Sequence, residues 1–108
     1  MNKKILIVED DQFLRDFYQE LLVSEGYIVD VAADGEIGLA KISHGGWNLV
    51  LLDIIMPEGD GIGVLKKIGK TAKVVVVSAV GQEKMVEEAK SLGALDYIVK
   101  PFDNEKVL

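Results

Sequence analysis

Residues Asn48-Leu49-Val50-Leu51-Leu52-Asp53 form an apolar run that ends in an acid, and a turn-forming segment, Ile54-Ile55-Met56-Pro57-Glu58-Gly59-Asp60-Gly61, follows them. Four consecutive apolar residues predict a short strand that is buried on both faces of a parallel sheet. The Pro and Gly residues indicate that the chain leaves the sheet at Asp53. Because open α/β sheets bind ligands at the carboxyl ends of their strands, Asp53 is a candidate functional residue. From this position alone, it is a ligand, a nucleophile or merely a polar residue leaving the core.

Length and composition predict one domain that spans residues 1–108, with 49% hydrophobic residues to form its core. Twelve Lys and Arg against eighteen Asp and Glu give a net charge of -6, which disfavours contact with nucleic acid or an anionic membrane. The absence of cysteine excludes disulfides and zinc-thiolate sites. The apolar run after the basic start is too short for a signal peptide or a membrane span. We therefore expect a cytoplasmic protein with protein or small cationic partners.

Apolar periodicity predicts four further strands and four helices. The strands are expected at residues 5–8, 27–32, 74–77 and 96–99. The helices are expected at residues 12–24, 36–42, 61–68 and 82–92. Asp11 is the predicted N-cap of the first helix, Gly26 ends it, and Gly38 is expected to weaken the second. The alternation of strands and helices predicts a parallel sheet with helices on both faces.

Right-handed crossovers place the carboxyl ends of all five strands at one edge of such a sheet. Four of these ends carry residues that could form a site, which are Glu9 and Asp10, Asp53, Ser78 and Lys100. Clustered carboxylates repel one another, and a hard divalent cation such as Mg²⁺ is the natural counter-charge for oxygen ligands. A lysine pairs with phosphate oxygens and a serine hydroxyl donates to them. The residues therefore predict a site for Mg²⁺ and a phosphoryl group beside Asp53.

The sequence as a whole resembles the response regulator receiver family, the CheY-like domains of two-component signalling. The matching motifs are Ile-Leu-Ile-Val-Glu-Asp-Asp at 5–11, Leu-Leu-Asp-Ile-Ile-Met-Pro at 51–57, Val-Val-Ser-Ala at 76–79 and Asp-Tyr-Ile-Val-Lys-Pro-Phe at 96–102. Each motif is weak alone, but their order and spacing are specific. The resemblance implies a doubly wound, flavodoxin-like sheet with strand order 2-1-3-4-5. Since the sequence stops at Leu108, the fifth helix of the family is expected to be truncated.

The resemblance also implies roles for the acids. Asp53 is expected to accept a phosphoryl group from the phosphohistidine of a histidine kinase or a histidine phosphotransfer protein. Asp10 and Asp53 are expected to bind Mg²⁺ directly, together with the backbone carbonyl of Ile55. Glu9 is expected to act on the metal mostly through water.

Three further residues receive a role from the resemblance alone. Ser78 is expected to move toward the phosphoryl oxygen, Lys100 to pair with it, and Tyr97 to follow Ser78 inward. The surface formed by helix 4, strand 5 and helix 5 then changes for a downstream effector protein or domain, and it is also a candidate dimer interface. Without the resemblance, Ser78 is only a strand-end hydroxyl and Tyr97 a half-buried core aromatic.

Two other functions are alternatives to a signalling switch. An aspartyl-phosphate phosphatase of the haloacid dehalogenase type needs a second acid two residues after the nucleophile, where this chain has Ile55, so a proton carrier is missing. A flavodoxin-like FMN binder needs a Ser/Thr/Gly phosphate cradle after the first strand, where the acids at 9–11 repel phosphate. We therefore expect no enzyme, only phosphotransfer and a slow loss of the phosphoryl group. The lone His44 is predicted to be an exposed loop residue.

Overall fold

The structure is a computed structural model, and it describes residues 3–53, 61–68, 72–78 and 83–99. Several expectations fall outside these residues. They concern the backbone carbonyl of Ile55, the side chain of Lys100 and the truncated fifth helix. The described residues contain the remaining members of the predicted site.

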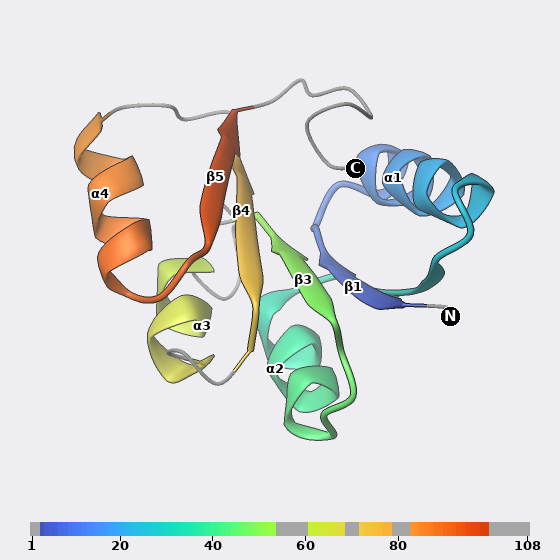
Figure 1. Cartoon of the computed structure of the whole chain (residues 1–108), viewed down its shortest axis with the longest axis horizontal. Coiled ribbons are helices and arrows are strands. Elements are labelled where there is room, and N and C mark those ends of the chain that lie inside the picture. Colours follow the sequence, from blue (N-terminus) through green and yellow to red (C-terminus); the bar gives the residue numbers. More distant parts are fainter. Residues whose placement is uncertain (1–2, 54–60, 69–71, 79–82, 100–108) are drawn as a thin grey trace.

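Five strands and four helices alternate along the described residues (Figure 1). The strands are β1 (Lys4–Val8), β2 (Ile28–Ala32), β3 (Leu49–Leu52), β4 (Val74–Ser78) and β5 (Asp96–Val99). The helices are α1 (Gln12–Ser24), α2 (Gly35–Ser43), α3 (Gly61–Ile68) and α4 (Glu83–Ser91). All strand pairs are parallel, and the order is β2-β1-β3-β4-β5. The predicted fold class and strand order are confirmed.

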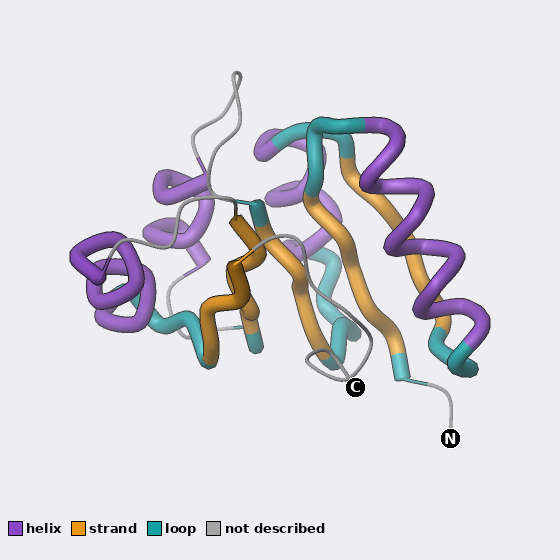
Figure 2. The backbone as a smooth tube through the Cα atoms, turned by 90° about the horizontal axis from the view of Figure 1, so that it is seen from above, coloured by secondary structure: helices purple, strands orange, loops and turns teal. Residues whose placement is uncertain are grey.

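Helices pack on both faces of the sheet, and the strands run side by side between them (Figure 2). Side chains alternate along each strand, so β1 sends Ile5 and Ile7 to one face and Leu6 and Val8 to the other. Ile5 and Ile7 pack with α1, on what we call the α1 face. Leu6 and Val8 belong to the core on the opposite face, which we call the α2/α3/α4 face. Two apolar layers therefore hold the sheet, as expected for a parallel sheet buried on both sides.

Asp11 is the N-cap of helix α1, as predicted. The Asp11 carboxylate accepts a hydrogen bond from the backbone N–H of Leu14 at 3.0 Å, which caps the helix. The helix has two apolar stripes, and only the stripe that contains Tyr18 and Leu22 is buried. Phe13 and Phe17 are 77% and 48% exposed. The periodicity therefore predicted the helix, but not which of its apolar residues face the sheet.

Helix α2 lies unusually close to β1 at Gly38. This glycine is buried, and a Cβ atom added to it would lie 2.9 Å and 3.0 Å from the two methyl groups of Val8. Val8 is itself buried and β-branched, so its methyl groups have little room to move. Gly38 is therefore more than a weak helix former, because it allows the helix to approach the strand that leads to Glu9.

A second set of contacts ties α2 to β2. The ammonium group of Lys41 donates to the Asp30 carboxylate at 3.0 Å and to the carbonyl oxygen of Val31 at 2.6 Å. The indole N–H of Trp47 donates to the carbonyl oxygen of Lys41 at 2.9 Å. Burial opposes ionisation of Asp30, but hydrogen bonds from Lys41 and from the N–H of Val31, with the charge of Lys41, lower its pKa below the ordinary value of 3.8.

We predict that Gly38→Val lowers the free energy of unfolding by about 1–3 kcal/mol, because the new side chain overlaps Val8 and α2 must shift. Ala40→Val is the matched control, since Ala40 is exposed on the same helix. That control loses only helix propensity, at most about 0.7 kcal/mol. Urea unfolding measures both, and equal losses in the two variants would refute the close approach.

We also predict that Asp30→Asn is less stable than the wild type at neutral pH, and that this difference shrinks in acid. The lowered pKa means that the ionised Asp30 stabilises the fold above its unfolded pKa, and that this contribution is lost as pH falls through the folded pKa. Because Asp30 is half exposed, the effect is small and decreases with salt. Unfolding at several pH values from neutrality down to about 2, which includes pH values below the lowered pKa of Asp30, checks it. A difference that is the same at every pH would contradict it.

Candidate functional site

The carboxyl ends of β1 and β3 lie next to each other in the sheet. Val8 is level with Leu52 in the parallel register, so Glu9 and Asp53 leave the sheet at the same height. The backbone N–H of Asp53 donates to the carbonyl oxygen of Val8 at 3.0 Å, and that of Glu9 donates to Ala32 of β2 at 3.0 Å. Ordinary sheet hydrogen bonds therefore fix the backbone of both acids.

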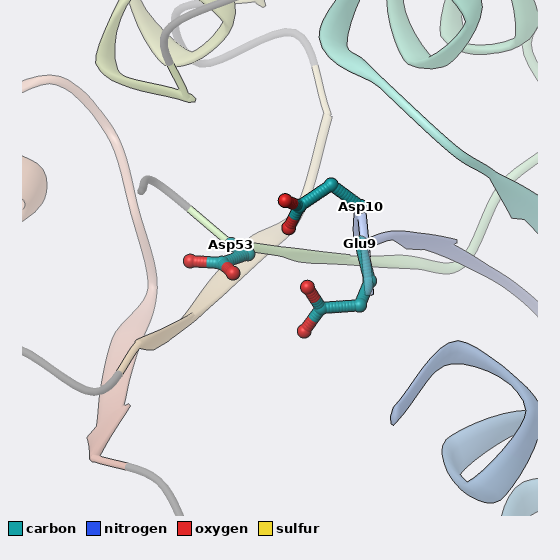
Figure 3. Close-up of side chains that lie close together, drawn as sticks. All are labelled: Glu9, Asp10 and Asp53. Carbon is teal, nitrogen blue, oxygen red and sulfur yellow. The ribbon is translucent and has the colours of Figure 1, made fainter. Parts of the chain in front are cut away.

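Three carboxylates gather at this edge. Glu9, Asp10 and Asp53 each offer an oxygen, and these three oxygens lie within 4.8 Å of one another. Figure 3 shows the three side chains lying close together at the ends of β1 and β3. Glu9 and Asp53 are only 2% and 6% exposed, whereas Asp10 is exposed. The cluster predicted from the strand ends is therefore present, with one member open to solvent.

The donor set of this cluster fits a hard divalent cation. Carboxylate oxygens are the ligands that Mg²⁺ and Ca²⁺ prefer, and the exposed side of Asp10 leaves room for the water molecules that Mg²⁺ keeps. Three negative charges at this spacing also oppose one another unless a cation offsets them. The described residues thus supply three of the four expected metal-binding groups.

Ser78 lies at the same edge of the sheet, one strand beyond β3. Ser78 is the last residue of β4 and is fully buried. Val76, two residues before it, is level with Leu52 of β3. Alternation along the strand places Ser78 on the same face as Val76, the α2/α3/α4 face. Tyr97 of β5 is half-buried against the core of that face. Ser78 and Tyr97 therefore share one face of neighbouring strands.

Arg15, which belongs to none of the sequence motifs, donates hydrogen bonds to the backbone of the acid pair. Its Nη1 atom donates to the carbonyl oxygen of Glu9 at 3.0 Å and to that of Asp10 at 3.2 Å. The backbone N–H of Asp11 donates to the Glu9 carboxylate at 3.3 Å. One signal was available: Arg15 is the only arginine in a chain whose other eleven basic residues are lysine.

Other predictions concern residues away from this edge. His44 is exposed after α2, as expected, and it is not among the residues of the acidic cluster. Within the residues that the structure describes, no helix has the length and apolar character needed to cross a membrane.

Comparisons of the sequence and of the structure with known proteins point to the same family. A family model described as the response regulator receiver domain matches residues 5–108. The chain is 46% identical to the chemotaxis protein CheY of Treponema pallidum, over 97% of this chain and 77% of that protein.

Two solved structures are also similar. One is a complex of CheX and CheY with BeF3 and Mg²⁺ from Borrelia burgdorferi, with a TM-score of 0.90 and 39% identity over 97% of this chain and 83% of that one. The other is the response regulator protein TrrA of Thermotoga maritima in complex with Mg²⁺ and BeF, with a TM-score of 0.86 and 34% identity over 97% and 92% of the two chains.

We predict that Asp10→Asn raises the free energy of unfolding by about 1 kcal/mol when EDTA removes divalent ions, because it relieves repulsion within the acidic cluster. With Mg²⁺ added, the wild type should gain more stability than the variant, since the ion binds the folded state. Asp16→Asn, which removes an exposed acid of α1 outside the cluster, controls for the net charge. Thermal unfolding with EDTA and with Mg²⁺ measures both effects. A loss of stability in Asp10→Asn without divalent ions would contradict the prediction.

Proposed function

Because the chain belongs to the response regulator receiver family of two-component signalling, we propose that its Asp53 is the residue that accepts the phosphoryl group. The observation that carries this proposal is the grouping of Asp53 with Glu9 and Asp10 at the carboxyl edge of the sheet. A receiver domain is a signalling switch that is phosphorylated, not a true enzyme. The donor is a histidine kinase or a histidine phosphotransfer protein.

Under this proposal, the acids of the cluster bind the metal ion. Asp10 and Asp53 bind Mg²⁺ directly, the backbone carbonyl of Ile55 completes the protein ligands, and Glu9 acts mostly through water. Support comes from the oxygen-only donor set and from the two similar structures, whose complexes contain Mg²⁺ and beryllofluoride. Beryllofluoride is a chemical analogue of a phosphoryl group. When bound, Mg²⁺ offsets negative charge on the phosphoryl oxygens during transfer.

The protein's own residues position the reaction. An oxygen of Asp53 forms a bond to phosphorus while the bond from phosphorus to the donor's histidine nitrogen breaks. The electron pair of that bond stays on the imidazole nitrogen, which takes up a proton. Asp53 is nearly buried, and its backbone is held by Val8, so little reorganisation is needed to direct its carboxylate toward the donor.

The signal is then passed on through Ser78, Tyr97 and Lys100. Ser78 moves to bond a phosphoryl oxygen, Lys100 pairs with the same group, and Tyr97 follows Ser78 inward. The shared face of Ser78 and Tyr97 on neighbouring strands supports this coupling. The populations of two conformations of the surface formed by α4, β5 and the fifth helix shift as a result.

The wider biological setting follows from the same proposal. Residues 1–108 act as one receiver domain, and the protein works in the cytoplasm. Its downstream partner is an effector protein or domain that binds the surface of α4, β5 and the fifth helix, and the same face is a candidate dimer interface. Neither nucleic acid nor a membrane is a direct partner, in keeping with the net charge of -6.

Incubation with acetyl phosphate and Mg²⁺ tests the role of Asp53. We expect intact mass spectrometry to show one added phosphoryl group in the wild type, none in Asp53→Asn, and none when EDTA is present. Asp34→Asn is the matched control, because Asp34 caps α2 and asparagine caps a helix equally well. Labelling that persists in Asp53→Asn would place the acceptor elsewhere. Rapid release of phosphate without a stable adduct would favour a phosphatase.

A further inference from the structure

We propose that Arg15 is a positioning residue that holds the Glu9–Asp10 pair in the geometry required to bind a divalent cation. This proposal rests on the proposed function, since it concerns the same metal site. The starting observation is that one atom, Nη1 of Arg15, donates to the carbonyl oxygens of two consecutive residues, Glu9 at 3.0 Å and Asp10 at 3.2 Å.

These two carbonyl groups belong to the two peptide units that flank Asp10. The Glu9 carbonyl lies in the peptide unit before Asp10, and the Asp10 carbonyl lies in the unit after it. Peptide units are planar, so only two backbone dihedral angles of Asp10 relate the two planes. A donor that bonds to both carbonyls restricts both angles and with them the direction in which the Asp10 side chain leaves the backbone.

Asp10 needs such a restraint more than its neighbours. Glu9 and Asp53 are buried, and the backbone N–H of each is held by a neighbouring strand. Asp10 follows the strand and is exposed, so packing does not direct its carboxylate. Repulsion from the other two carboxylates favours conformations that turn Asp10 away from them. The bonds from Arg15 oppose that movement.

The position and type of this residue are informative. Arg15 is the fourth residue of α1, near the positive end of the helix dipole, where a cation is unfavourable. It is also the only arginine among twelve basic residues. The planar guanidinium is preorganised to donate several hydrogen bonds in fixed directions, which an ammonium group on a flexible stem is not. A need for directed hydrogen bonds to two carbonyl groups explains both the position near the start of α1 and the choice of arginine over lysine. A general need for positive charge explains neither.

The test compares Arg15→Met and Arg15→Lys with the wild type by titration calorimetry of Mg²⁺, without any phosphoryl donor. Groups that orient metal ligands typically change metal affinity by about 10–100-fold. We expect Mg²⁺ to bind about tenfold more weakly to Arg15→Met, and Arg15→Lys to be weakened despite its retained charge. A residue that acted only through its charge would show the reverse, since removing a cation strengthens Mg²⁺ binding in Arg15→Met and leaves Arg15→Lys unchanged. That result would overturn the proposal.

A second readout is the amide hydrogen exchange of Asp10 and Asp11 in the metal-free proteins. Loss of the restraint should speed exchange at these two amides in both Arg15 variants. Lys41→Met is the matched control, because Lys41 also donates to a backbone carbonyl, that of Val31, but is not part of the acidic cluster. In this control the free energy of unfolding should fall while Mg²⁺ affinity stays unchanged.

The outcomes separate the two proposals. Lower stability in Arg15→Met with unchanged Mg²⁺ affinity and unchanged exchange would show a purely structural role and overturn the inference. A wild-type protein that binds no Mg²⁺ would instead defeat the proposed function. In that case the exchange measurement still decides whether Arg15 orders the acid pair. If Arg15→Met does not fold, the charge-retaining Arg15→Lys provides both measurements.

Discussion

The parallel pairing of β1 with β3 is the constraint on which the rest of the site depends. It makes Val8 level with Leu52, and the hydrogen bond from the N–H of Asp53 to the carbonyl oxygen of Val8 places two acid-bearing strand ends side by side. Both Val8 and Leu52 are fully buried, so apolar packing keeps the strands together even though the side chains beyond them repel. A cation that binds the cluster removes this repulsion and stabilises the fold at the same time.

Contacts from three other elements preserve this arrangement. The carbonyl oxygen of Ala32 in β2 accepts a hydrogen bond from the N–H of Glu9. Helix α2 packs closely against Val8 at Gly38, and Arg15 of α1 donates hydrogen bonds to the carbonyl oxygens of the acid pair. Each of these contacts fixes backbone close to the acids. The backbone that carries the three acids is therefore held in place by the fold itself. Such preorganisation is the property that electrostatic stabilisation of a transferring phosphoryl group requires.

Much of the fold and of the site could be predicted from the sequence, for physical reasons. Apolar runs such as Val74–Val77 are short and rich in β-branched residues, and the acids and glycines that follow such runs mark where the strands end. Parallel strands with one hand of crossover then bring Glu9, Asp10 and Asp53 to one edge. The features that escaped prediction depend on three-dimensional distances. The contact of Arg15 with the acid pair and the close approach of α2 at Gly38 leave no repeating pattern in the sequence. The apolar residues of α1 recur at helical spacing whether they are buried or, like Phe13, exposed, so spacing alone does not show which of them face the sheet.

A crystal structure of the protein grown with Mg²⁺ and beryllofluoride would locate both the phosphoryl acceptor and the metal ligands. We expect beryllium bonded to a carboxylate oxygen of Asp53 and a Mg²⁺ ion bound by Asp10 and Asp53, with Glu9 close enough to act through water. Beryllofluoride on another residue, or Mg²⁺ bound elsewhere while these three carboxylates remain without a ligand, would contradict this expectation.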